Sequence, residues 1–138
     1  NIARGYKDVR NIIFTSDVVK RDTLEINNEG ETFLINRTLR SGQKIKKSGN
    51  IVIIGDINPG AEVIAGGDII VFGKIRGVVH AGVKGTNASV TALRLEPTQL
   101  RISKKIARPP EGAAKSNEIK PERAFIQDGQ IMVEKFEI

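Results

Sequence analysis

The stretch GNIVIIGDI at residues 49–57 returns as GDIIVFGKI at residues 67–75, after 18 positions. Around it an apolar residue recurs at every sixth position, at Phe33, Leu39, Ile45, Ile51, Ile57, Val63, Ile69, Ile75 and Ala81. Six positions are three strand periods, so all these side chains point inward only if the chain turns corners between them. Three sides of six residues make a triangular coil of about 18 residues. The sequence therefore predicts an all-β fold, a triangular β-helix (solenoid).

Glycine stands two places before the apolar residue in four of these units, at Gly49, Gly55, Gly67 and Gly73. We expect these glycines at the corners, because glycine adopts a positive φ without steric cost. The β-branched residues between them favour extended backbone. The alternative fold is an antiparallel sandwich, whose turns would come about every 8–12 residues.

The pattern divides the chain into four parts. Residues 1–22 are interpreted as a linker or the remnant of a preceding domain, and residues 23–107 as the β-helix, with a small insertion where the six-residue register is lost at Asn87. Residues 108–121 contain two adjacent prolines and are expected to form a loop. Residues 122–138 carry two alternating runs around Asp128-Gly129, a strong hairpin signal. We expect these C-terminal strands to pack on the β-helix and close it.

Stacking by 18 residues also sorts the outward side chains. One predicted row holds Leu34, Val52 and Ile70, and a neighbouring row holds Ile54 and Phe72. The outer surface of one side of the prism would then be apolar, and such a patch is rarely left bare. We expect these five residues to form the interface of a two-fold homodimer. The alternative is that the C-terminal segment covers them.

A second outward row is polar and holds Arg40, Asn58 and Arg76, each 18 positions from the next. Small residues beside this row leave the backbone approachable. Two guanidinium groups one coil apart would form a site for carboxylates on a partner. The alternative is that both arginines are ordinary solvated charges.

Composition narrows the function. The net charge is +6, concentrated at residues 44–47 and 101–108, which attracts anionic partners or keeps exposed strand edges apart. Aromatic residues make up only 4% of the chain and no nucleic-acid-binding motif is present, so we expect no nucleic acid partner. No run approaches the roughly 18 apolar residues of a membrane span.

The residues also argue against an enzyme. Cys is absent and His80 is the only histidine, so neither a zinc site nor a catalytic triad is expected. The glycine spacing of residues 77–82 suggests a phosphate loop, but Val83-Lys84 breaks the motif. Asp56 and Asp68 stand in Gly-Asp-Ile corners and are interpreted as turn formers. We predict no catalytic residue, no metal and no cofactor.

Three segments in order, RSGQ at residues 40–43, GDINPGAEVIA at 55–65 and GKIRG at 73–77, resemble the C-terminal domain of the bacterial septum-site-determining MinC family. The resemblance covers about residues 24–106 and, more loosely, the C-terminal strands. It implies a right-handed β-helix that dimerises and acts as a non-enzymatic cell-division inhibitor. Residues 1–22 are too short for the family's N-terminal inhibitory domain, so if this chain is a fragment, it is the dimerising and targeting half.

The resemblance also implies partners. They are the ATP-bound, membrane-associated ATPase MinD and the tubulin-like protein FtsZ. The resemblance further implies that this protein is cytoplasmic and that MinD recruits it to the inner face of the membrane. The RSGQ motif assigns Arg40, Ser41, Gly42 and Gln43 to the MinD-binding surface. Asp56, Asn58 and Arg76 are added because the 18-residue stacking brings them beside that motif, although Arg76 could belong to the FtsZ contact instead.

Two other classes stay open. A bactofilin-like β-helix would stack end to end into filaments, although the RSGQ motif and the predicted hairpin cap count against it. A hexapeptide-repeat acyltransferase also has coils of 18 residues, with His80 as the candidate catalytic residue. The six-residue units here lack the small residue that such enzymes favour directly after the aliphatic one.

Overall fold

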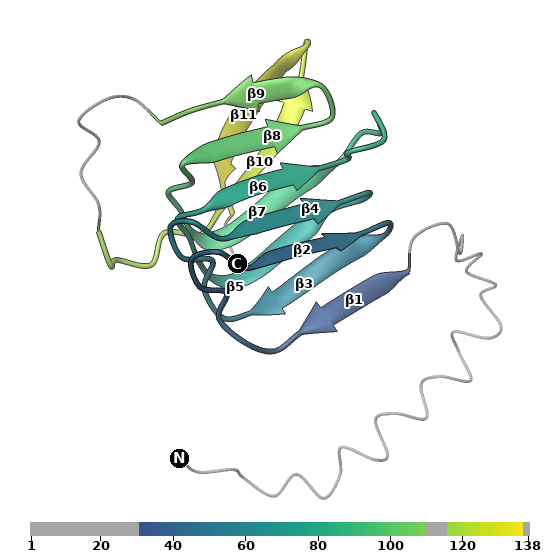
Figure 1. The fold of residues 1–138 in the computed structure, drawn as a ribbon. Coiled ribbons are helices and arrows are strands. Elements are labelled where there is room, and N and C mark those ends of the chain that lie inside the picture. Colours follow the sequence, from purple (N-terminus) through teal and green to yellow (C-terminus); the bar gives the residue numbers. More distant parts are fainter. Residues whose placement is uncertain (1–30, 110–115, 137–138) are drawn as a thin grey trace, which may run out of the picture.

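The computed structural model describes residues 31–109 and 116–136 (Figure 1). The predicted linker at residues 1–22 lies outside the described residues, as do residues 23–30 of the predicted β-helix, residues 110–115 of the predicted loop and residues 137–138 at the end of the chain. The described residues form an all-β solenoid, as predicted from the repeat.

Two sheets form two sides of the solenoid. The strands are β1 (Thr32–Ile35), β2 (Lys44–Lys47), β3 (Asn50–Ile54), β4 (Glu62–Ala65), β5 (Ile69–Ile75), β6 (Val78–Ala81), β7 (Ser89–Leu95), β8 (Gln99–Ile102), β9 (Lys105–Ala107), β10 (Glu122–Gln127) and β11 (Gln130–Lys135). The first sheet has the order β1-β3-β5-β7-β10-β11 and the second β2-β4-β6-β8-β9. The third side is held by single parallel bridges that join Leu39, Ile57 and Ile75.

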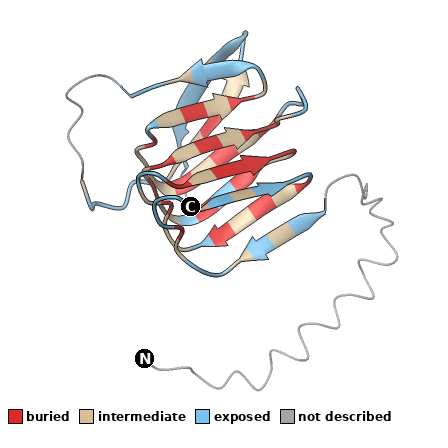
Figure 2. Ribbon diagram, in the orientation of Figure 1, coloured by how far each residue is buried: buried red, intermediate tan, exposed pale blue. Residues whose placement is uncertain are grey.

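The predicted 18-residue stacking is confirmed in the first coils. Ile51 pairs with Phe33 below it and with Ile69 above it, both 18 positions away. Figure 2 shows the result as buried positions that alternate with less buried ones along successive strands. Seven of the nine predicted inward residues are fully buried, whereas Phe33 and Ile45 are only half-buried, because β1 and β2 are edge strands of their sheets.

The coil length changes earlier than the sequence predicted. Val63 pairs with Val79, 16 positions on, and not with Ala81. The shorter coil packs Gly77 tightly against the coil below, where an added Cβ would collide with the carbonyl oxygens of Asn58 and Ala61. The next coil is longer, since Ile69 pairs with Val90, 21 positions on. The predicted insertion near Asn87 is therefore present, but the register is already lost ten residues before it, at Gly77.

The predicted reason for the corner glycines is wrong for three of the four. Only Gly55 has a positive φ, of 148°. At Gly49 and Gly73 an added Cβ would collide with a backbone carbonyl oxygen of the coil below, and at Gly67 with the side chain of Asn50. These glycines allow close stacking of coils, rather than an unusual backbone angle.

Two antiparallel hairpins end the coiling. The predicted hairpin is confirmed: β10 and β11 are joined by Asp128 and Gly129, both with positive φ, as a tight two-residue hairpin turn requires. β10 pairs antiparallel with β7, so the hairpin covers the edge of that strand. The sequence did not predict the second hairpin, in which the chain reverses after Ser103 and β9 pairs with β8.

Candidate partner-docking surface

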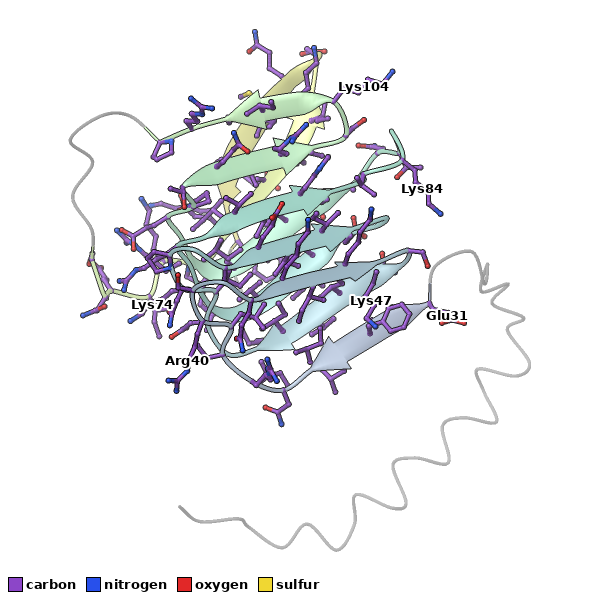
Figure 3. All side chains as sticks on the ribbon, in the orientation of Figure 1. Glu31, Arg40, Lys47, Lys74, Lys84 and Lys104 are labelled. Atoms are coloured by element: carbon purple, nitrogen blue, oxygen red, sulfur yellow. The ribbon has the colours of Figure 1, made fainter. Side chains whose placement is uncertain are left out.

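The RSGQ motif forms an exposed turn directly after the buried Leu39. The N–H of Gln43 donates to the carbonyl oxygen of Arg40 at 2.9 Å, and the side-chain oxygen of Gln43 accepts from the N–H of Arg40 at 2.8 Å. Gly42 has a φ of 87°, which favours glycine at the third position of this turn. The turn is thereby rigid while the Arg40 side chain is exposed and points away from the solenoid (Figure 3).

A second turn stacks on the first, one coil above it. It runs from Asn58 to Ala61, whose N–H donates to the carbonyl oxygen of Asn58 at 3.0 Å. The N–H of Gly42 donates to the carbonyl oxygen of Gly60 at 2.9 Å and joins the two turns. The N–H of Asn58 donates to the carbonyl oxygen of Leu39 at 3.0 Å.

Arg76 continues the row in the third coil, because its N–H donates to the carbonyl oxygen of Ile57 at 2.7 Å. The backbone thus brings Arg40, Asn58 and Arg76 to one edge of successive coils, as the 18-residue spacing predicted. We call the turn at residues 40–43, together with Asn58 and Arg76, the docking surface.

Asp56 lies two residues before Asn58 and makes structural hydrogen bonds. Its Oδ1 accepts from the N–H of Lys74 at 2.8 Å, and its own N–H donates to the hydroxyl of Thr38 at 3.1 Å. Asn50 and Asp68 make the same kind of contact with the coils above them. The Asp56 side chain therefore joins two successive coils, rather than closing a local turn as the sequence suggested, and its contact with a partner stays a prediction.

The Arg76 side chain is held by two groups that sequence reasoning did not connect with it. Its Nε lies 3.6 Å from Oε1 of Glu96. Its Nη2 donates to the carbonyl oxygen of Ser116 at 3.3 Å and to Oδ1 of Asn117 at 3.0 Å. Lys74 Nζ donates to the same Oδ1 at 2.8 Å. We call residues 116–121 the strap. No periodic signal predicted this contact, which joins residues about 40 positions apart.

Glu96 is the centre of this cluster. Its side chain is 13% exposed, its Oε1 lies 3.5 Å from Nε of Arg94, and its Oε2 accepts from the N–H of Ser116 at 3.1 Å. Burial raises the pKa of Glu96, but the hydrogen bond from Ser116 and the charges of Arg94 and Arg76 outweigh burial and lower it below its ordinary value. Glu96 is therefore ionised at neutral pH and ties two arginines to the strap.

The predicted apolar rows lie on the outer surface of the first sheet. Leu34 pairs with Val52, Val52 with Ile70, and Ile54 with Phe72. Leu34 is 65% exposed and Phe72 is 56% exposed. We call these five residues the apolar outer face. In the described part of the chain the C-terminal hairpin extends the sheet beyond β7 instead of lying over this face.

His80, the candidate catalytic residue of the acyltransferase alternative, contacts the backbone of a neighbouring turn. His80 Nε2 lies 2.9 Å from the carbonyl oxygen of Ser103, which links β6 to the turn after β8. No group of three His, Cys, Asp or Glu side chains that could hold a metal ion occurs in residues 31–109 and 116–136. Within the same ranges no helix is long and apolar enough to cross a membrane.

The comparisons with known proteins agree with one another. Residues 33–136 match the family described as septum formation inhibitor MinC, C-terminal domain. A probable septum site-determining protein MinC of Heliobacterium modesticaldum is 56% identical over 106 residues, and one of Acetivibrio thermocellus is 50% identical over 109 residues. These matches cover 76% and 78% of this chain but only 36% and 48% of those relatives.

One solved structure is similar in both fold and sequence. It is a chain of the MinC:MinD cell division protein complex of Aquifex aeolicus, with a TM-score of 0.72 and 45% sequence identity. The match covers 78% of this chain and 88% of that chain.

Proposed function

The chain belongs to the MinC family through its C-terminal domain, and from this premise we propose that it is a non-enzymatic adaptor that binds MinD and inhibits division at wrong sites. The observation that carries the proposal is the rigid, exposed turn at residues 40–43, stacked beneath Asn58 in the next coil. The similar chain from Aquifex aeolicus was solved in a complex with MinD, which supports MinD as the partner.

The docking surface suits a protein partner with acidic side chains. The side chain of Arg40 is exposed, and its planar guanidinium group can bind a carboxylate through two parallel hydrogen bonds. Ser41 and Gly42 are small and exposed, so a partner backbone can approach the turn closely. Gln43 fixes the turn through its side chain, so its role is to hold Arg40 in place.

The adaptor works as a dimer in this proposal. Two chains joined through the apolar outer face present two copies of the docking surface. A MinD dimer held on the membrane by ATP offers two matching sites, and two-sided binding multiplies the affinity by avidity. The inhibitor would then be recruited from the cytoplasm to the inner face of the membrane, where it also contacts FtsZ.

The test is capture of ATP-loaded MinD by the immobilised chain. We expect Arg40→Ala to weaken capture about tenfold or more, since a hydrogen bond to a charged group contributes about 1.5–3 kcal/mol. Lys104→Ala is the matched control, because Lys104 is an exposed cation at a distant corner of the molecule (Figure 3). Equal capture by Arg40→Ala and the wild type would contradict the site.

A further inference from the structure

Two cationic side chains at the edge of the docking surface converge on one oxygen atom. Lys74 Nζ and Arg76 Nη2 lie 2.8 Å and 3.0 Å from Oδ1 of Asn117. The amide oxygen that they bind is neutral. Both hydrogen bonds already have a charged donor, and a carboxylate oxygen in the same position would add the attraction between opposite charges to each of them. The pair is thus better matched to a carboxylate than to its present occupant.

The pair is continuous with the row that carries the proposed function. Arg76 follows Arg40 and Asn58 on successive coils, and Lys74 lies at the same edge of the solenoid as Arg40 (Figure 3). Glu96 holds the Nε side of the Arg76 guanidinium and leaves its Nη2 directed at the strap. The guanidinium group is therefore oriented before any partner arrives, which lowers the entropic cost of binding.

The strap is held mainly by hydrogen bonds. Apart from the Asn117 bonds, the N–H of Ser116 donates to Glu96 at 3.1 Å and its carbonyl oxygen accepts from Arg76 at 3.3 Å. The N–H of Lys120 donates to the carbonyl oxygen of Leu93 at 2.8 Å, and the carbonyl oxygen of Pro121 accepts from the N–H of Phe136 at 3.0 Å. Asn117 and Glu118 are exposed, and Ile119 is 66% exposed, so the strap buries little apolar surface. Segments with few buried apolar contacts open at low free-energy cost.

We propose that Lys74 and Arg76 form a second carboxylate-binding site of the docking surface, which Asn117 occupies in cis until an acidic side chain of the partner displaces it. The inference rests on the proposed function, because it takes the partner to be the ATPase that binds the Arg40 turn. The strap then acts as a competitor within the same chain. The apparent affinity for the partner is then the intrinsic affinity multiplied by the fraction of molecules in which Lys74 and Arg76 are free of Asn117.

The experiment measures the affinity for ATP-loaded MinD of three chains that differ at one position. Asn117→Ala removes the cis oxygen, so we expect affinity to rise about threefold to tenfold. Asn117→Asp places a carboxylate between the two cations, so we expect affinity to fall below that of the wild type. Asn87→Ala is the control, because Asn87 is exposed on the loop before β7, away from the strap, and should leave the affinity unchanged.

A double variant tests whether the gain passes through the cation pair. In a Lys74→Ala background, the gain from Asn117→Ala should shrink, because one of the two groups that the partner carboxylate needs is missing. This coupling separates release of the pair from a general loosening of the strap.

Amide hydrogen exchange gives a readout that needs no mutation in this chain. In the free chain we expect protection of the Ser116 amide, and we expect MinD to abolish it. Equal affinities of the wild type, Asn117→Ala and Asn117→Asp would overturn the cis competition while the proposed function stands. Unchanged Ser116 protection in the complex would overturn it as well. Failure of the wild-type chain to capture MinD would overturn both.

Discussion

Glu96 shows how one side chain can connect the fold with the docking surface. It receives the N–H of Ser116 and lies within 3.6 Å of the guanidinium groups of Arg76 and Arg94. No other carboxyl in the described ranges has two arginine partners. Protonation of this one group would weaken the hold on both the strap and Arg76.

The lowered pKa of Glu96 predicts a pH dependence of stability. The unfolded chain binds the proton more tightly than the folded chain, so the stabilisation is fully present above the ordinary value of 4.5 and is lost as the pH falls through the lower folded pKa. We expect Glu96→Gln to remove this part of the acid-induced loss. The measurement is the free energy of unfolding in urea at a series of acidic pH values.

The matched control is Glu118→Gln, which changes an exposed carboxyl on the same strap. The control should follow the wild-type curve. A wild-type curve that is parallel to that of Glu96→Gln throughout the acidic range would contradict the assigned role of Glu96.

At the scale of the element, the C-terminal hairpin completes the core. Ala124 of β10 is fully buried opposite Val90 of β7, and so continues the inward row of Ile51 and Ile69 by one further strand. The hairpin also pairs the edge of β7, which would otherwise present unpaired backbone groups. This arrangement leaves no open strand edge of β7 for the end-to-end stacking of a filament-forming β-helix.

Ala124→Glu tests the attachment of the hairpin. A charge without a partner at this buried position should destabilise the protein by at least about 3 kcal/mol. Val133→Glu is the control, since Val133 of β11 pairs with Ala124 but is 48% exposed. The free energies of unfolding in urea compare the two variants, and equal values would show that the hairpin does not seal the core.

At the scale of the whole molecule, the two proposed surfaces belong to different parts of the prism. The apolar outer face lies on the first sheet, whereas the docking surface follows the corner between the third side and the start of the second sheet. A dimer formed through the first sheet therefore need not bury either copy of the docking surface. This separation is what simultaneous binding to two partner molecules requires.

We expect the double variant Ile54→Asp, Phe72→Asp to be a monomer of 15.1 kDa by sedimentation equilibrium and the wild type to be a dimer. Charges would be desolvated in the centre of the apolar interface, where they oppose association. Ile106→Asp is the control, because Ile106 is similarly exposed but lies on the second sheet. An unchanged mass of the double variant would exclude this face as the interface.

The repeat alone was enough to predict the coil, its inward rows and its exposed apolar and polar rows. Side-chain direction in a strand depends on parity, and an 18-residue coil returns each position to the same face. The same spacing is sufficient to predict that Arg40, Asn58 and Arg76 share one edge of the solenoid. The Asp128-Gly129 turn could be predicted because its two positive φ angles favour Asp and Gly at these positions.

Only the tertiary structure decided where the coil changes length, where β9 reverses and what binds Arg76. The short corner at Gly77 depends on carbonyl oxygens of the coil below, and the strap reaches Lys74, Arg76 and Glu96 across 20 to 43 positions of sequence. Such contacts have no period and no local propensity. They form because buried charges and backbone groups must find partners wherever the folded chain brings them together.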